Sequence, residues 1–352
     1  MKSHGELRDL AKALHVLRTG SSEHAALVTI LRTSGSTFRR VGAAMLVRHD
    51  GSIVNALAGG CPQRDLVERA QQAMVSGQLA YVSYNAENGF DLMVETGCGG
   101  ELDVVVEPLT SLSLGFLGSL DDALASQRSF RVVTDFPAAG DASSTVRRIE
   151  MLEANEGSCA GDTASSEFRS DGTAVLTEQF DAPVSLIIAG AGTQSADLAI
   201  IASQLGWRGV IVDPSVERIA AMALAVPGWS AAPVRPEALM DALRVSEATA
   251  LVAMTHHLDV DVAYLRAGEA YGAFYLGALG SRERARTIMS MVQSPVLHVP
   301  AGLDIGSNAT TEISVSIVAE IMAVRSARDG TALSRRRGPI HGKKPAPLSL
   351  TA

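Results

Sequence analysis

Hydrophobic residues recur along the chain with two different spacings, one typical of helices and one of strands. Residues 6–19 carry leucines three or four positions apart, and residues 62–76 repeat such a pattern behind Pro62, so both segments are predicted helices. Short apolar runs predict strands at residues 25–31, 43–47, 79–84 and 102–107. We therefore expect a mixed α+β domain over residues 1–110.

The pattern weakens between residues 111 and 182, where serine and glycine accumulate. Only short strands near residues 130–133 and 173–176 stand out. This composition is typical of loops. The segment 111–182 is therefore predicted to be a bridging region with flexible loops.

A regular alternation of strands and helices begins at Pro183. Residues 184–189 form an apolar run that leads into Gly190, as expected for a buried strand followed by a tight turn. Further strands are predicted at residues 209–213, 250–254 and 273–276, with helices between them. Strands that alternate with helices form a parallel sheet covered on both faces. The predicted fold class is α/β, with a Rossmann-type domain over residues 183–327 and a disordered basic tail over residues 328–352.

Composition narrows the class of protein. The 352 residues are 47% hydrophobic and 19% charged, which is enough apolar material for two packed domains. The net charge of -8 argues against nucleic acid as the main partner, since phosphate backbones bind clustered lysine and arginine. The sequence contains no run of about 18 apolar residues, so we expect no membrane span. Three cysteines without disulfide spacing are typical of a reducing cytoplasm.

Two of the three cysteines stand next to glycines. Cys61 follows Gly59 and Gly60, and Cys98 lies between two glycines. Because glycine has no Cβ, a ligand can approach the backbone beside such a thiol closely. The pattern indicates sulfur chemistry or cofactor binding. The alternative is a pair of small buried side chains beside tight turns.

A polar, basic loop joins the two predicted strands that precede Cys61. It carries Ser36, Arg39 and Arg40. Arginine presents a planar fork of donors that suits phosphate or carboxylate. Together with the cysteines, this loop would hold an anionic ligand through arginine and a soft atom through thiolate.

The turn that begins at Gly190 resembles a dinucleotide-binding fingerprint. Gly190 permits a tight turn, Gly192 lets a diphosphate approach the backbone, and Asp213, about 20 residues on, is placed to bond ribose hydroxyls. The third fingerprint position is Ser195 instead of glycine or alanine, which predicts looser packing of the helix on the sheet. The turn either binds a nucleotide such as NAD(P) or only packs within the fold.

Two more polar turns follow strands of the same sheet, at the edge where open α/β sheets bind ligands. His256 and Asp259 would bind a metal, cap the next helix through Asp259, or have no chemical role. Gly280, Ser281 and Arg282 repeat the order of strand, glycine turn and helix. They form a second candidate anion site, with Ser281 as the predicted helix cap.

In these motifs and their order the chain resembles the XdhC/CoxI family, the accessory factors of xanthine dehydrogenase and related molybdenum hydroxylases. The motifs span almost the whole chain: Gly35-Ser36 through Arg39 to Ala43 with Met45, Gly59-Gly60-Cys61, Cys98-Gly99-Gly100, Ile188 to Gly192, Val212-Asp213-Pro214, Met254-Thr255-His256, Leu276 to Arg282, Pro300 to Gly306, and Glu312 to Ile321.

The resemblance implies binding of the molybdenum cofactor (molybdopterin), a pterin that carries a dithiolene and a phosphate. Such proteins hold the cofactor while a cysteine desulfurase replaces an oxo ligand with sulfur, and then deliver it to an apo molybdenum hydroxylase. By this resemblance Cys61 contacts the cofactor or handles sulfur, with Cys98 as the second candidate, and Arg39 or Arg40 binds the phosphate. A sheltered handover is also compatible with a homo-oligomer.

The chain departs from the family pattern at three places. Pro62 and Gln63 follow the cysteine where the family has an apolar residue and glutamate, and Thr193 replaces the histidine that usually follows Gly-Ala-Gly. Near the last predicted helix, Thr310-Thr311 replaces the usual Thr-Pro, a change compatible with helix capping. The lost carboxylate would change proton handling or partner contact near Cys61.

Three functions are compatible with the sequence. The first is a maturation chaperone, not a catalyst, for a molybdenum hydroxylase. The second is an NAD(P)-dependent oxidoreductase with His256 as acid/base, and the third is a protein-interaction adaptor. The first makes Cys61 necessary for cofactor retention, the second requires NADH binding, and the third requires neither.

Overall fold

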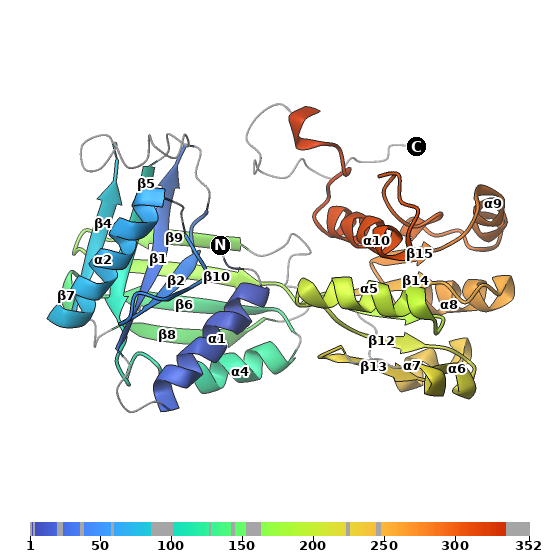
Figure 1. The fold of residues 1–352 in the computed structure, drawn as a ribbon, viewed down its shortest axis with the longest axis horizontal. Helices are drawn as coiled ribbons and strands as arrows, with labels where there is room; N and C mark the ends of the chain where they lie inside the picture. The colour runs from blue at the N-terminus through green and yellow to red at the C-terminus, as the bar shows by residue number, and fades with distance from the viewer. Residues whose placement is uncertain are drawn as a thin grey trace. The chain divides into compact units, whose positions relative to one another are not determined.

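The computed structural model describes residues 2, 4–19, 24–35, 39–57, 60–85, 101–126, 128–141, 145–152, 163–222, 226–243 and 248–335, with the backbone alone at Gly60, Cys61, Asp141 and Met240. The chain divides into two compact units (Figure 1). Unit 1 comprises residues 1–158 and 162–182, and unit 2 comprises residues 159–161 and 183–352.

Unit 1 contains an antiparallel sheet of six strands in the order β3-β2-β1-β5-β4-β7. Its strands are β1 (Ala25–Ser34), β2 (Ala44–Arg48), β3 (Ile53–Val54), β4 (Gln78–Tyr84), β5 (Glu101–Pro108) and β7 (Gly140–Asp141). The helices α1 (His4–Thr19) and α2 (Gly60–Ser76) belong to the same part of the chain. The two helices and four strands predicted in this part are confirmed.

Both faces of this sheet are buried in unit 1. Side chains alternate along a strand, so Ala26 and Val28 of β1 pack with Leu66 of α2, on one face of the sheet. Ala25 and Leu27 pack in the cluster that includes α1 and α4 (Leu117–Ser126). Consecutive positions of β1 are therefore apolar.

Residues 111–158 and 162–182 belong to unit 1, although the sequence pattern predicted a bridging region. They form α4 and an antiparallel sheet in the order β8-β6-β10-β9. The strands are β6 (Phe130–Phe136), β8 (Val146–Met151), β9 (Thr163–Phe168) and β10 (Ala174–Phe180). Phe136 and Leu176 share a buried cluster with Leu31 of the first sheet. The pattern failed here because β8 and β9 are largely exposed and polar, which weakens their periodicity.

Unit 2 contains a parallel sheet in the order β13-β12-β11-β14-β15-β16. The strands are β11 (Ser185–Ala189), β12 (Arg208–Val212), β13 (Trp229–Ala232), β14 (Thr249–Ala253), β15 (Tyr275–Ala278) and β16 (Leu297–His298). The helices are α5 (Thr193–Gln204), α6 (Val216–Ala221), α7 (Leu239–Ala242), α8 (Leu258–Ala270), α9 (Arg282–Met291) and α10 (Thr310–Arg325), with short 3-10 turns at Pro236–Ala238 and Leu333–Arg335.

This strand order is that of the doubly wound Rossmann fold, and it reverses direction between β11 and β14. Ile188 of β11 packs with Leu198 of α5 and Ile317 of α10. Ile187 packs on the other face, in the cluster that contains Leu265 of α8. The predicted fold class, a mixed α+β part followed by a Rossmann-type parallel sheet, is confirmed.

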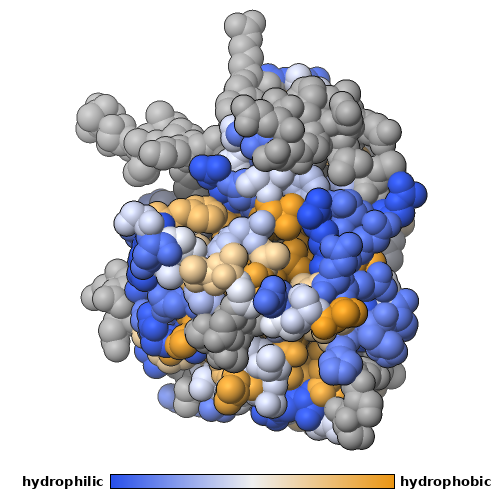
Figure 2. Space-filling view, turned by 90° about the vertical axis from the view of Figure 1, so that its left-hand side faces the viewer, coloured by the Kyte–Doolittle hydropathy of each residue, from blue (hydrophilic) through white to orange (hydrophobic). Residues whose placement is uncertain are grey.

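Over the face of unit 1 that Figure 2 shows, hydrophilic residues border smaller hydrophobic groups, as on most water-exposed protein surfaces. Within the described ranges, no helix combines the length and apolar character needed to cross a bilayer.

Candidate functional site

A pocket of about 240 Å³ lies at the carboxyl edge of the unit 2 sheet, where the strand order reverses. The turns after β11 and β14 line it, together with the first residues of α5 and one residue each from α6 and α10. The lining residues are Gly190, Ala191, Gly192, Thr193, Gln194, Ser195, Arg218, Met254, Thr255, His256 and Thr310. Open α/β sheets bind ligands at this position. The structure thus brings Gly190, Gly192 and His256 into one pocket.

The first turn contains two glycines, and each position is occupied by glycine for a different physical reason. Gly190 has a φ of +122°, and a Cβ there would lie 2.6 Å from the Met254 carbonyl oxygen, so the close approach of the two turns requires glycine. Gly192 has an extended backbone with φ −176°. A Cβ on Gly192 would meet no described atom within 4 Å. Its missing side chain therefore leaves open space at the start of α5.

Ser195 ties the glycine turn to α5 and does not loosen it, contrary to the prediction from the fingerprint. Its side chain is 2% exposed. The hydroxyl donates to the Gly190 carbonyl and lies 3.1 Å from the Met254 sulfur. A serine at this position replaces the usual close packing of a smaller residue with a buried hydrogen bond.

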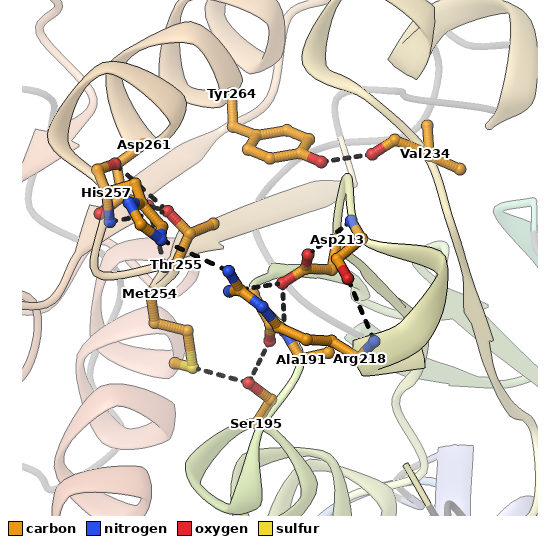
Figure 3. Close-up of polar contacts among 12 residues, drawn as sticks. Ala191, Ser195, Asp213, Arg218, Val234, Met254, Thr255, His257, Asp261 and Tyr264 are labelled. Atoms are coloured by element: carbon orange, nitrogen blue, oxygen red, sulfur yellow. Dashed lines mark hydrogen bonds and ion pairs between the residues drawn. The ribbon is translucent and has the colours of Figure 1, made fainter. Parts of the chain in front are cut away.

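Asp213 is bound by the protein's own amides (Figure 3). One carboxylate oxygen accepts from the Ala191 amide at 3.0 Å, and the other accepts from the Ser215 amide at 2.8 Å. Asp213 is only 1% exposed. The carboxylate that sequence spacing assigned to a ribose therefore joins the end of β12 to the glycine turn.

Arg218 lies between Asp213 and His257 (Figure 3). One guanidinium nitrogen is 3.5 Å from the Asp213 carboxylate, and another is 3.4 Å from His257 Nε2. Both distances are at the long limit of hydrogen bonding. The Arg218 side chain is 47% exposed, so its remaining donors can reach a ligand in the pocket.

A buried carboxylate holds the turn after β14. The amide and the hydroxyl of Thr255 donate to one oxygen of Asp261, at 2.9 and 2.7 Å, and Asp261 is fully buried. His256 follows with a φ of +64°, a left-handed conformation that is uncommon outside glycine. Of the three alternatives for His256 and Asp259, a helix cap at Asp259 does not hold, because the N-cap position of α8 is His257 and Asp261 makes the contacts to Thr255.

The turn after β15 supports this arrangement. Arg284 donates to Asp261 at 2.7 Å, and Ser281 caps α9 by accepting from the Arg284 amide, as predicted. A Cβ on Gly280 would lie 2.5 Å from Arg284 Cδ, so glycine makes room for this side chain. Gly280, Ser281 and Arg282 are not among the described residues that line the pocket.

The basic loop of unit 1 is described at Gly35 and again from Arg39, and Ser36 lies outside the described residues. Arg39 pairs with Glu6 of α1 at 2.7 Å, and both side chains are mostly buried. Arg40 is exposed, and its carbonyl accepts from the Ala43 amide. A phosphate at Arg39 would therefore compete with Glu6 for the guanidinium.

Gly42, near the end of this loop, lies over a buried ion pair. Lys2 donates to the Gly42 carbonyl at 2.7 Å and lies 2.7 Å from a Glu178 oxygen. Gly42 has a φ of +81°, and a Cβ there would lie 2.8 Å from the same oxygen. This contact fixes the loop where it enters β2.

The backbone of Cys61 lies in the first turn of α2, which begins at Gly60. Its side chain, Gly59 and Cys98 lie outside the described residues. Gln63, at the position where the family has glutamate, makes structural contacts. Its side-chain oxygen accepts from the Leu57 amide at 3.3 Å, and its nitrogen lies 2.6 Å from the Met45 sulfur. It thus holds the segment that precedes α2.

Asp65, one turn further along α2, is a carboxylate that the sequence argument missed. It accepts from the Tyr84 hydroxyl and from Arg69 at 2.7 Å. Burial raises the pKa of Asp65, but the hydrogen bonds from Tyr84 and Arg69 lower it below its ordinary value. Burial raises the pKa of Tyr84. The spacing of Asp65 and Arg69 by four residues was the available signal.

Arg218 and Asp261 were also missed in unit 2. Each lies in the first turns of a helix that follows a strand, where cations and acids ordinarily have structural roles, so their positions in the chain offered no reason to prefer them. No group of three or more His, Cys, Asp or Glu residues in the described part of the chain is placed to hold a metal.

The fold and the pocket define a protein of two units, one of them a Rossmann unit with a pocket at its switch point. A family model described as the XdhC Rossmann domain matches residues 186–321, and one described as the XdhC and CoxI family matches residues 13–85. Together they cover more than half of the chain, which belongs to the XdhC/CoxI family.

Relatives are similar over almost the full length. The chain is 26% identical to a protein of Bacillus subtilis named as a probable xanthine dehydrogenase subunit, over 86% of this chain and 94% of the relative. It is 24% identical to the molybdenum cofactor insertion chaperone PaoD of Escherichia coli, over 87% and 85%. A crystal structure described as a xanthine dehydrogenase from Bacillus halodurans superposes with a TM-score of 0.73 at 25% identity, over 94% of this chain and 98% of that chain.

Proposed function

We propose that this protein is a cytoplasmic maturation chaperone that binds the molybdenum cofactor, holds it during sulfuration and delivers it to an apo molybdenum hydroxylase of the xanthine dehydrogenase type. The observation that carries this proposal is full-length similarity, through both units, to a relative named as a molybdenum cofactor insertion chaperone. A cysteine desulfurase is the proposed sulfur donor, and the chain is proposed to act as a carrier and not as a catalyst. Self-association remains a proposal that native mass determination would test.

Within unit 1 we propose Cys61 as the thiol that meets the cofactor. The backbone places Cys61 at the start of α2, and Gln63 and Leu57 brace the segment before it. Cys98 is the second proposed contact. When bound, the cofactor would supply the molybdenum centre whose oxo ligand is exchanged for sulfur.

The described residues of unit 1 fit the phosphate of this cofactor only in part. Arg39 is paired with Glu6, and the Arg40 side chain is exposed. We propose that Arg39 or Arg40 contacts the phosphate, and at Arg39 the phosphate would compete with Glu6 for the guanidinium. Cofactor retention by Arg39→Ala and by Arg40→Ala tests which of the two arginines is needed.

The proposal is tested by the molybdenum and pterin content of the full chain, purified without oxygen from cells that make the cofactor. Wild-type protein and Cys159→Ser should retain both in comparable amounts, while Cys61→Ser should lose most of them. Equal retention of molybdenum and pterin by Cys61→Ser and Cys159→Ser would contradict the proposed role of Cys61. Absence of both from the wild-type chain would refute cofactor binding itself.

The alternative is an NAD(P)-dependent oxidoreductase in unit 2. The observation in its favour is the pocket at the switch point, with His256 on its rim. The bonds of Asp213 to backbone amides count against it, since they occupy the carboxylate that would read a ribose. Tight binding of NADH, abolished in His256→Ala or Gly192→Val, would favour the oxidoreductase.

A further inference from the structure

We infer that the outer edge of strand β9 in unit 1 is an interface between two copies of this chain, formed when β9 of one copy pairs antiparallel with β9 of the other. The inference rests on the proposed self-association and names its surface. It does not depend on binding of the molybdenum cofactor.

Strand β9 lies at one end of the second sheet of unit 1, whose order is β8-β6-β10-β9 (Figure 1). It pairs with β10 over all six of its residues without a shift in register. Among the described strands, none pairs with its other edge. Four of the six residues are exposed, namely Thr163, Ser165, Glu167 and Phe168. A row of backbone donors and acceptors along this edge can therefore pair with a further strand.

The other edge strands are protected, whereas β9 is not. Proteins protect open edges with short strands, charged side chains, proline or bulges, because such edges pair with other chains. In the described sheets, β3, β7 and β16 have two residues each and β13 has four. Strand β8 has six residues and carries Arg147, Arg148 and Glu150. Strand β9 also has six residues, but Glu167 is its one charge and it contains no proline.

The sequence of β9 is complementary to itself. In an antiparallel pair related by a two-fold axis, opposing side chains lie on the same face of the sheet, so one residue lies opposite its own copy. With Ser165 on the axis, Ala164 lies opposite Ser166 of the second copy, and Thr163 lies opposite Glu167 of the second copy. The Thr163 hydroxyl can then donate to the Glu167 carboxylate.

The charge of Glu167 selects this register. With Ser166 on the axis, the two Glu167 side chains would be diagonal neighbours roughly 7–8 Å apart, and with Glu167 on the axis they would be directly opposite. The Ser165 register keeps them further apart than either.

Small side chains near the axis also suit the face of β9 that packs on the first sheet. The Ser166 hydroxyl donates to the Leu31 carbonyl of β1, and a Cβ on Gly42 would lie 3.0 Å from the Ala164 Cβ. Pairing of Ala164 with Ser166 therefore requires no space for a large side chain on this crowded face.

The size of the contact predicts a reversible dimer. Stable protein interfaces bury about 1,200–2,000 Å² of surface in total, and a single pair of short strands lies at or below the lower limit. We therefore expect a monomer–dimer equilibrium with a dissociation constant on the order of 10 µM.

The test is the mass of the full chain, measured by light scattering over roughly 1–200 µM protein. The wild type should pass from monomer to dimer over this range. Ser165→Lys and Ser165→Asp each place like charges opposite one another at the axis, so each should weaken association at least about fivefold. An equal mixture of the two variants should regain association, because opposite charges then meet. The control Val146→Lys adds the same charge at an exposed position of β8, on the opposite edge of the same sheet, and should associate like the wild type.

A wild-type chain that stays monomeric at the highest concentration would overturn the inference. A dimer that Ser165→Lys weakens no more than Val146→Lys would also overturn it, since self-association would then use another surface. If the mixture of Ser165→Lys and Ser165→Asp does not regain association, the substitutions act on the fold and not across an axis, and the interface is again wrong.

Molybdenum and pterin content, measured on the same samples from cells that make the cofactor, separates this inference from the proposed chaperone function. A monomer that retains both would refute the β9 interface alone. A dimer that retains neither, and that Ser165→Lys weakens, would support the interface and refute cofactor binding.

Discussion

The Arg284 guanidinium donates to the Asp261 carboxylate at 2.7 Å, and this contact joins α9 to α8, the helices that follow the neighbouring strands β15 and β14. Asp261 is fully buried and also accepts both the amide and the hydroxyl of Thr255. One carboxylate thus positions the turn that carries His256 into the pocket. The contact explains why Gly280 is a glycine, since a Cβ there would meet Arg284.

Replacing Asp261 by asparagine should destabilise unit 2 by about 3 kcal/mol, because Arg284 loses its counter-charge and an NH2 donor replaces one of the two carboxylate oxygens that accept from Arg284 and Thr255. The value lies at the low end for a broken buried ion pair, since the Arg284 side chain is still 24% exposed. Urea unfolding followed by tryptophan fluorescence measures this loss in unit 2. Asp259→Asn, an exposed acid on the same helix, is the control and should change stability by less than about 0.5 kcal/mol. Equal stability of the two variants would contradict the role of Asp261.

Glu320 of α10 should make unit 2 sensitive to acid. It accepts from the Tyr275 hydroxyl at 2.6 Å and from the Gly302 amide at 2.8 Å, and it lies 3.6 Å from His298. Burial raises its pKa, but the hydrogen bonds from His298, Tyr275 and the Gly302 amide lower it below the ordinary 4.5. The folded state therefore favours the ionised form more than the unfolded state does. This stabilisation is complete above the ordinary pKa and disappears as the pH falls through the lower folded value.

This prediction is tested by measuring the free energy of unfolding in urea, at several pH values, for Glu320→Gln and for the wild type. The variant should be less stable by about 1–2 kcal/mol at neutral pH, because the hydrogen bonds to a charged acceptor become weaker. The difference should shrink as the pH drops well below 4.5. Glu269→Gln, at an exposed position on α8, is the control, and its stability relative to the wild type should not change with pH in this way. A constant difference at every pH would mean that ionisation of Glu320 does not contribute.

In unit 1, Glu178→Gln should leave Lys2 buried without a counter-charge. The two side chains are 5% and 6% exposed, so we expect a loss of about 3 kcal/mol or more. Because both tryptophans lie in unit 2, the measurement is hydrogen exchange of the β6 and β10 amides in the full chain. Exposed Glu167→Gln on the neighbouring strand β9 is the matched control.

A second variant distinguishes the loss of the Lys2–Glu178 ion pair from a general packing effect. Lys2→Met together with Glu178→Gln should recover part of the lost protection, since no buried charge remains unpaired. If the double substitution is less stable than Glu178→Gln by the full cost of Lys2→Met alone, the two side chains are not coupled.

The sequence by itself determined the two helices and four strands predicted over residues 1–110, and the class of the second unit. Apolar runs such as Leu186 to Ala189, each followed by a glycine turn and a helix, are local features, and local spacing is sufficient to predict buried parallel strands. The sequence also predicted that Gly190, Gly192 and His256 lie at one edge of the parallel sheet, because the carboxyl ends of parallel strands lie together. The resemblance to the XdhC/CoxI family rested on the same motifs.

Only the tertiary structure decided which donors and acceptors meet. Asp213 was predicted to face a ribose, yet it bonds to the amide of Ala191, which lies 22 positions away in sequence. Arg39 was predicted to face a phosphate, yet it pairs with Glu6 from another helix. The polar strands β8 and β9 find their partners through backbone pairing, which leaves little hydrophobic pattern in the sequence. The periodicity of hydrophobic residues indicates which side of a single segment is buried. Hydrogen bonds and ion pairs between segments depend instead on which distant segments the tertiary structure brings together.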